Sequence, residues 1–177
     1  YNRVDPLNPA ETSAFVNALP SPYETLATGV TGPMWELVAR QLTLLRTYAA
    51  FDFELADTAS DANYFVSDFS NPNNRDAAGI AARPGNTPIL AFNVRTWNTY
   101  SDQQQDWIVL HELGHTLGLR HPAGLPAELD YSQYSIMAYN WYDLGDNDFG
   151  EGLPRTPMAL DIAVLQAKYG AAAANTG

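Results

Sequence analysis

The chain of 177 residues contains no cysteine and only one lysine, Lys168. Without cysteine, disulfide bonds, thiolate metal sites and a thiol nucleophile are all excluded. Nine basic residues stand against 20 acidic ones, and the net charge of −11 argues against a nucleic-acid-binding surface. No apolar run approaches the roughly 18 residues that cross a bilayer, so we expect no membrane span.

The start of the chain also lacks the marks of a secretion signal. It shows neither a basic start nor an apolar stretch, and it begins at Tyr1 instead of Met. We therefore expect a mature form or a fragment, without a targeting segment. With 46% hydrophobic residues, one folded domain is expected over residues 1–177.

The spacing of apolar residues predicts an α+β order of elements. A proline-rich start with a short helix near residues 11–19 is expected to precede a helix over 33–49. Ser101 and Gln104 form a capping box that opens a second helix over 102–117, which Gly118 ends. Strands are expected between these two helices, at residues 51–56, 63–68, 77–82 and 89–94.

The expected elements divide the domain into two halves. The N-terminal half, about 1–118, holds the sheet and the helix over 102–117. The C-terminal half, 119–170, shows little regular structure before Thr156 and Pro157 open a last helix that stops at Gly170. Residues 171–177 are predicted to be a linker stub.

All three histidines of the chain lie in one run, HELGHTLGLRH. His111 and His115 are four residues apart on the expected helix, so their rings leave the same face one turn apart. Gly118 tolerates the positive φ of a sharp turn, after which His121 returns as a third ligand. Three neutral imidazoles at about 2.0–2.1 Å suit one zinc ion and leave a position open for water.

Glu112 projects beside His111, near the expected metal but not on it. Zinc lowers the pKa of bound water to about 7, and Glu112 is predicted to take that proton as general base and pass it to the leaving amine. A lone HExxH also occurs in ordinary helices, where both residue types are merely solvated. The addition of Gly118 and His121, with no histidine elsewhere, favours a metal site.

The run H-E-x-x-H-x-x-G-x-x-H resembles the metzincin signature, and residues 135–139 (SIMAY) resemble the Met-turn of these zinc peptidases. Pro122 after the third histidine, Tyr139 two residues after Met137, and the stretch 157–170 are similar to the serralysin family. The resemblance covers residues 77–170. It implies a metzincin-type domain with a twisted mixed sheet, an active-site helix, and a mostly irregular C-terminal half closed by a helix.

The resemblance also implies an activity. It points to a zinc-dependent endopeptidase, secreted from a bacterium and monomeric, that cleaves extended protein segments. A catalytically silent binding module is the alternative, and the presence of both Glu112 and Tyr139 argues against it. A zinc peptidase with a carboxylate as third ligand is disfavoured, because His121 takes that role.

Further residues acquire roles through the resemblance alone. Met137 is expected as an apolar floor beneath the imidazoles, and Tyr139 as a fifth ligand or an oxyanion donor. Asp161 is expected to be a buried acid that hydrogen-bonds the Met-turn, while Gly79 and Ala81 lie on an edge strand that pairs with substrate. The alternatives are a core methionine, a packed tyrosine, a solvated helix-start aspartate and an edge strand without a partner.

Two features depart from the serralysin pattern. No glycine- and aspartate-rich calcium-binding roll is present, and Leu160 takes the place of a second acid before Ile162. Calcium is also considered for two clusters of oxygen-bearing residues, although neither has EF-hand spacing and solvated loops are the favoured interpretation. These clusters are Asp143, Asp146, Asp148 and Glu151, and Asp68, Asn73, Asn74 and Asp76.

Overall fold

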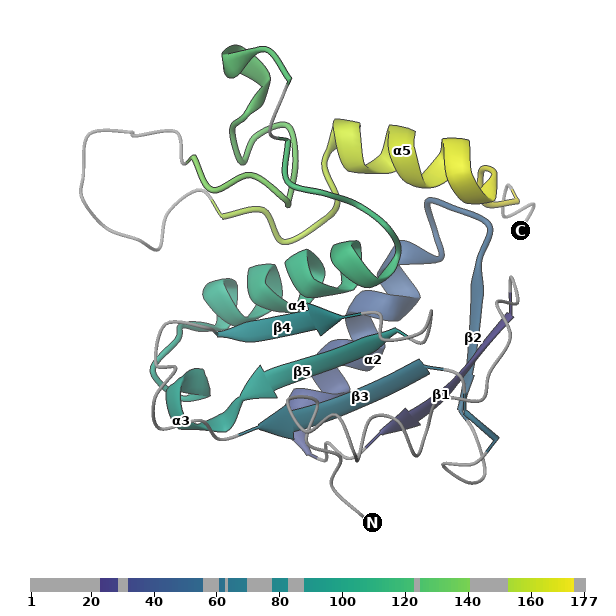
Figure 1. Cartoon of the computed structure of the whole chain (residues 1–177), viewed down its shortest axis with the longest axis vertical. Coiled ribbons are helices and arrows are strands. Elements are labelled where there is room, and N and C mark those ends of the chain that lie inside the picture. The colour runs from purple at the N-terminus through teal and green to yellow at the C-terminus, as the bar shows by residue number, and fades with distance from the viewer. Residues whose placement is uncertain are drawn as a thin grey trace.

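The computed structural model describes residues 23–28, 32–55, 61–62, 64–69, 78–82, 88–122, 125–140 and 153–173. These ranges hold one sheet, four α-helices and a short 3-10 helix (Figure 1). The strands are β1 (Tyr23–Thr28), β2 (Asp52–Leu55), β3 (Tyr64–Phe69), β4 (Gly79–Ala82) and β5 (Ile89–Asn93). The helices are α2 (Pro33–Leu45), α3 (Val94–Trp97), α4 (Asp102–Thr116), η3 (Ala127–Leu129) and α5 (Ala159–Tyr169).

The sheet is mixed, in the order β2-β1-β3-β5-β4. Its first four strands in that order pair in parallel, and β4 pairs antiparallel with β5 at the edge. Every residue of β5 is buried, as expected for an inner strand covered on both faces. The predicted α+β fold with a mixed sheet is confirmed.

Helices α2 and α4 pack on each other, and α4 also contacts β4 and β5. The main hydrophobic core lies between these elements, with Val38, Leu45, Leu90, Phe92 and Leu110 among its fully buried members. The position of helix α4 is therefore fixed by its packing on the sheet and on α2. No helix in the described ranges is long and apolar enough to span a membrane.

The structure corrects the predicted order at its start. Residues 23–28 were expected to be irregular, yet they form β1, which lies between β2 and β3 in the sheet. Helix α2 ends at Leu45 and not at residue 49, and α5 begins at Ala159, three residues after Thr156. The short helix expected near residues 11–19 lies outside the described residues.

The described C-terminal half lies on the side of α4 that faces away from the sheet (Figure 1). Gln103 on α4 donates to the carbonyl of Leu153 at 2.9 Å. Beside it, the buried carboxylate of Asp106 accepts hydrogen bonds from Arg40 and Gln41 on α2 at 2.8 and 2.9 Å. Arg155 binds the other oxygen of Asp106, its Nε donating at 2.6 Å, so this one acid ties α2, α4 and the C-terminal half together.

Candidate metal centre

Helix α4 carries two of the three histidines, and both of its ends are fixed. At the start, the capping box predicted from Ser101 and Gln104 is present. At the end, the amides of Gly118 and Leu119 donate to the carbonyls of His115 and Gly114 at 3.0 and 2.8 Å, which is a Schellman motif. Gly118 has φ +94°, so the turn needs a glycine.

Helix α5 closes this turn from outside. Leu117 is the C-cap residue of α4. Its carbonyl accepts from Nζ of Lys168 at 2.7 Å and from the hydroxyl of Tyr169 at 3.0 Å. A Cβ on Gly118 would collide with the same Nζ. A cation at the negative end of a helix is favourable, so the only lysine of the chain stabilises the turn that leads to His121.

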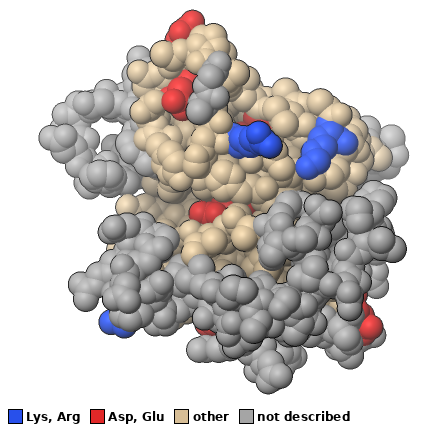
Figure 2. Space-filling view, viewed as in Figure 1, with Lys and Arg blue, Asp and Glu red and all other residues tan. Residues whose placement is uncertain are grey.

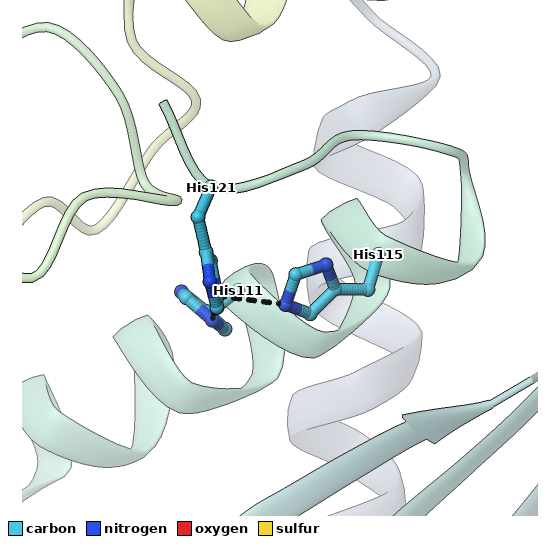
Figure 3. Close-up of side chains that lie close together, drawn as sticks. All are labelled: His111, His115 and His121. Atoms are coloured by element: carbon cyan, nitrogen blue, oxygen red, sulfur yellow. Dashed lines mark hydrogen bonds between the residues drawn. The ribbon is translucent and has the colours of Figure 1, made fainter. Parts of the chain in front are cut away.

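The three histidine rings converge on one point (Figure 3). His111 and His115 extend from α4, and His121 enters from the returning chain. Nε2 of His121 lies 3.1 Å from Nε2 of His115 and 3.2 Å from Nε2 of His111. The structure thus brings together all three residues that were predicted as metal ligands.

Hydrogen bonds on the opposite ring nitrogens set the tautomers. Nδ1 of His111 lies 2.9 Å from the carbonyl oxygen of Ile136, and Nδ1 of His115 lies 3.2 Å from that of Leu119. A carbonyl only accepts, so each Nδ1 carries the proton and each Nε2 presents a lone pair to the centre. Nε2 of His121 can direct a proton at only one of these two Nε2 atoms. Without a cation, lone pairs of the neighbouring Nε2 atoms therefore face each other.

A cation relieves this repulsion, and the geometry fits zinc. Nitrogens at about 2.0–2.1 Å in a tetrahedral arrangement stand about 3.4 Å apart, close to the separations seen here. Burial also lowers the pKa of His111 to about 4, and burial lowers the pKa of His115 as well. Both imidazoles are therefore neutral at neutral pH, as metal ligation requires, and the triad fits a zinc-binding site.

The side chain of Glu112 extends from α4 to the edge strand β4. A Cβ built on Gly79 would stand 2.7 Å from Cγ of Glu112, so only glycine leaves room for this side chain. Burial raises the pKa of Glu112 to about 7, and a hydrogen bond from the backbone of Ala81 offsets part of this effect. Gly79 and Ala81, predicted as substrate-binding residues, thus also contact the predicted base.

Tyr139 stands at the open side of the triad. Its hydroxyl lies 3.2 Å from Nε2 of His111, and its ring centroid is 4.7 Å from that of His121. The side chain is 55% exposed, which leaves it accessible from solvent. Partial burial and the nearby charge of Glu112 both raise the pKa of the Tyr139 hydroxyl, so it keeps its proton at neutral pH.

The Met-turn is held by a buried acid from α5. Asp161 accepts from the hydroxyl of Ser135 at 2.7 Å, from the amide of Ile136 at 2.8 Å and from the amide of Met158 at 2.8 Å. Through them Asp161, expected as a buried acid beside the Met-turn, joins that turn to the start of α5. They place the carbonyl of Ile136 where it orients His111.

Two residues of α4 near the site were not singled out by sequence reasoning. Nε1 of Trp107 donates to the carbonyl of Ile136 at 3.1 Å, and its ring packs against His111. A Cβ on Gly114 would lie 2.6 Å from Sδ of Met137, so this glycine lets the buried Met-turn approach the helix. Trp107 lies four residues before His111 on the same helical face, and that spacing is a signal that could have identified it.

The proposed calcium clusters fall mostly outside the described residues. Asp143, Asp146, Asp148 and Glu151 all lie there, as do Asn73, Asn74 and Asp76. Asp68 is described as part of β3. The calcium hypotheses therefore stay predictions.

The fold and the site together define a class of protein. A mixed sheet with a helix that carries two histidines, followed by a glycine turn and a third histidine, is the arrangement of a metallopeptidase. The sequence model of the M57 peptidase family, described as "Dual-action HEIGH metallo-peptidase", matches residues 20–147. The chain belongs to this family. Its own version of the five-residue motif is HELGH, with Leu113 in place of isoleucine.

The predicted similarity to serralysins is confirmed. The chain is 32% identical to Serralysin B of Dickeya chrysanthemi over 117 residues, which cover 55% of this chain and 24% of the relative. It is 36% identical to Metallopeptidase AprA of Pseudomonas marginalis over 105 residues, or 50% of this chain and 20% of that protein. The matched region therefore spans only a fifth to a quarter of the length of these relatives.

Solved structures of myroilysin share the fold. One has a TM-score of 0.57 at 19% identity and covers 85% of both chains. A second has a TM-score of 0.54 at 20% identity, with 85% of this chain and 94% of that chain covered. At such low identity the likeness is evidence of the fold alone.

Proposed function

We propose that the chain is a zinc-dependent endopeptidase that hydrolyses peptide bonds in extended protein segments. The observation that carries the proposal is the convergence of three imidazole Nε2 atoms, two of them held as lone-pair donors by backbone carbonyls. Zinc bound there would supply a Lewis acid that activates water and polarises the scissile carbonyl. His111, His115 and His121 are its proposed ligands.

Glu112 is the proposed general base. It is the residue directly after His111 on α4, and its side chain packs against Gly79 of the edge strand β4. A base in this position can take a proton from water beside the triad and deliver it to the amine that leaves. Gly79 leaves room for Glu112, because any larger residue would overlap its side-chain stem.

Strand β4 is the proposed binding edge for an extended substrate. The amide of Asn93 donates to the carbonyl of Ala78, and the antiparallel pattern alternates from there. Gly79 and Ala81 therefore direct their backbone groups away from β5, towards the free edge. The amide of Ala81 is engaged by Glu112. Within the described part of the chain no strand pairs with the outer edge of β4, so the carbonyl of Ala81 and both groups of Gly79 are available for pairing.

Tyr139 is the proposed partner of the oxygen that becomes negative during hydrolysis. Its protonated hydroxyl lies next to the triad and is accessible, so it can donate a hydrogen bond to a polarised carbonyl. Met137 is proposed as the apolar support beneath the ligands, and Asp161 as the acid that positions the Met-turn.

Replacing the base is the central test. We expect Glu112→Gln to retain one zinc per chain while kcat/KM for an unfolded protein substrate falls by about 10²–10⁴. Zinc content by elemental analysis and cleavage by gel electrophoresis measure the two effects separately. A zinc-loaded wild-type chain that cleaves nothing would indicate the silent binding module instead, and a Glu112→Gln variant with full activity would remove Glu112 from the mechanism.

Gly79→Ala tests whether the strand positions the base. The added Cβ would push on Cγ of Glu112, so we expect a tenfold or larger loss of kcat with unchanged zinc content. Ile80→Val on the same strand is the matched control, because it alters a side chain but adds no atom beside Glu112. Equal activity in Gly79→Ala and the control would contradict the positioning role.

Secretion and a bacterial source stay proposals that rest on the serralysin resemblance. Detection of the protein in the culture medium of its natural host, and not in the cells, is the expected result.

A further inference from the structure

A hollow of about 450 Å³ adjoins the metal centre on the side of the C-terminal half. Its lining residues are Ala127, Asp130, Tyr131, Tyr139 and Asn140. Tyr139 belongs to both places, because its hydroxyl reaches His111 while its side chain forms part of the hollow. The volume is at the small end of ligand pockets, roughly 300–1,000 Å³, and suits one long side chain more than a peptide segment.

The chemistry of the lining is acidic and aromatic. Among the described lining residues, Asp130 is the only charged one, and the two tyrosines and Asn140 add rings and amide or hydroxyl oxygens. Among the described residues, no hydrogen bond or ion pair engages the carboxylate of Asp130. In Figure 2, acidic atoms lie over the segment 125–140 that projects from the molecule, whereas the basic atoms visible on this half lie nearer to α5.

We propose that this hollow binds a cationic side chain of the substrate, with arginine preferred over lysine, and that Asp130 determines this specificity. A guanidinium pairs with a carboxylate through two parallel hydrogen bonds and stacks on aromatic faces, which Tyr131 and Tyr139 supply. An ammonium makes a point contact only. The net charge of −11 adds a long-range attraction for basic segments. The inference rests on the proposed peptidase function.

The test is a cleavage profile of the zinc-loaded protein on a library of unstructured peptides, read by mass spectrometry. We expect arginine, and then lysine, to be enriched at a single position close to the scissile bond. A pair of peptides with arginine or citrulline at that position then isolates the charge, because citrulline keeps the shape. The arginine peptide should have a kcat/KM about fivefold higher, which corresponds to one partly exposed ion pair.

Asp130→Asn should bring this ratio close to one, chiefly by lowering kcat/KM for the arginine peptide about fivefold. Glu128→Gln is the matched control, because Glu128 is an exposed acid on η3 that does not line the hollow. We expect the control to keep the wild-type ratio. In wild-type protein, 0.5 M salt should also reduce the ratio by screening, a measurement that does not depend on the folding of any variant.

The outcomes separate this inference from the function on which it rests. If the zinc-loaded wild type cleaves no peptide, the proposed function fails and the inference fails with it. If it cleaves peptides without a preference for arginine, or if the preference survives in Asp130→Asn, the inference alone is overturned.

Discussion

The two halves of the molecule are stabilised in different ways. The N-terminal half is a sheet packed against α2 and α4, and its core consists of residues such as Val38, Leu45 and Phe92 that exclude water completely. The described part of the C-terminal half has little regular structure before α5. It adds buried apolar side chains such as Ile136, Met137 and Leu165 to the same core, and individual polar contacts fix the path of its chain. Among these contacts, Asp106 and Asp161 each accept hydrogen bonds from several partners. Lys168 donates to the carbonyl of Leu117 at the C-terminal end of α4.

This difference separates stability from metal binding. Apolar burial is non-directional and sets the free energy of unfolding, whereas hydrogen bonds fix where a ligand atom stands. The triad lies between the two halves, because α4 supplies two ligands and the Met-turn orients one of them. Substitutions in one half should therefore change one property more than the other.

The largest effect on stability is expected from the core of the N-terminal half. Leu45→Ala leaves a cavity at a fully buried position and should lower the free energy of unfolding by about 2–5 kcal/mol. Zinc affinity of the folded fraction should stay within twofold of wild type. Urea denaturation and chelator competition measure the two quantities, with Leu125→Ala, at a position 46% exposed, as the neutral control.

A smaller loss of stability but a larger loss of metal is expected from the Met-turn. Asp161→Asn replaces an oxygen that accepts hydrogen bonds with an amide that donates, so one of three donors loses its partner. We expect a cost of about 1–3 kcal/mol and zinc binding weaker by roughly 10–100-fold. Asp130→Asn removes the same charge elsewhere in this half and should leave zinc binding intact. Equal zinc affinities in all three proteins would contradict the division between the halves.

The smallest effect, and one that depends on pH, is expected at the contact between the halves. Burial alone raises the pKa of Asp106, but hydrogen bonds from Arg40, Arg155 and Gln41 outweigh it, and the pKa lies below its usual 3.8. A carboxyl group with a lowered folded-state pKa stabilises the protein above that usual value, and the stabilisation is lost as the pH falls through the folded-state pKa.

Asp106→Asn should therefore lower the free energy of unfolding by about 1–2 kcal/mol at pH 7, because both arginine partners are largely exposed. The difference from wild type should shrink below about pH 4. Denaturant titrations across this pH range measure it. Asp102→Asn, at an exposed position on the same helix, is the control and should show no comparable decline.

The same division explains what could be predicted from the sequence. Helix α4 and its ligands were predictable, because the capping box, the four-residue histidine spacing and Gly118 are all local signals. Strand β1 was missed since it follows a proline-rich start, and its stability comes from parallel pairing with β2 and β3, which are distant in sequence. Local patterns carry no information about such partners.

Within the site, the ligands were predictable and their supports were only partly so. The roles of Met137 and Asp161 came from resemblance. The structure places Sδ of Met137 beside Gly114 of α4 and the carboxylate of Asp161 at the amide of Ile136. Lys168 donates to the carbonyl of Leu117 in the space beside Gly118, and Gly114 leaves space for Met137. Both contacts depend on how α4 meets elements from the C-terminal half. No spacing in the sequence encodes that approach.

The acceptors that orient His111 and His115 are main-chain carbonyls, those of Ile136 and Leu119. Every amino acid carries this group, so no replacement of Ile136 or Leu119 deletes the acceptor itself. The tautomers that expose both metal-binding nitrogens are thereby shielded from single-codon change at those positions. The orientation of the two imidazoles can therefore be lost through the residues that place the carbonyls, which include Gly114, Gly118 and Asp161. A substitution at Ile136 would act differently, through its buried side chain in the core.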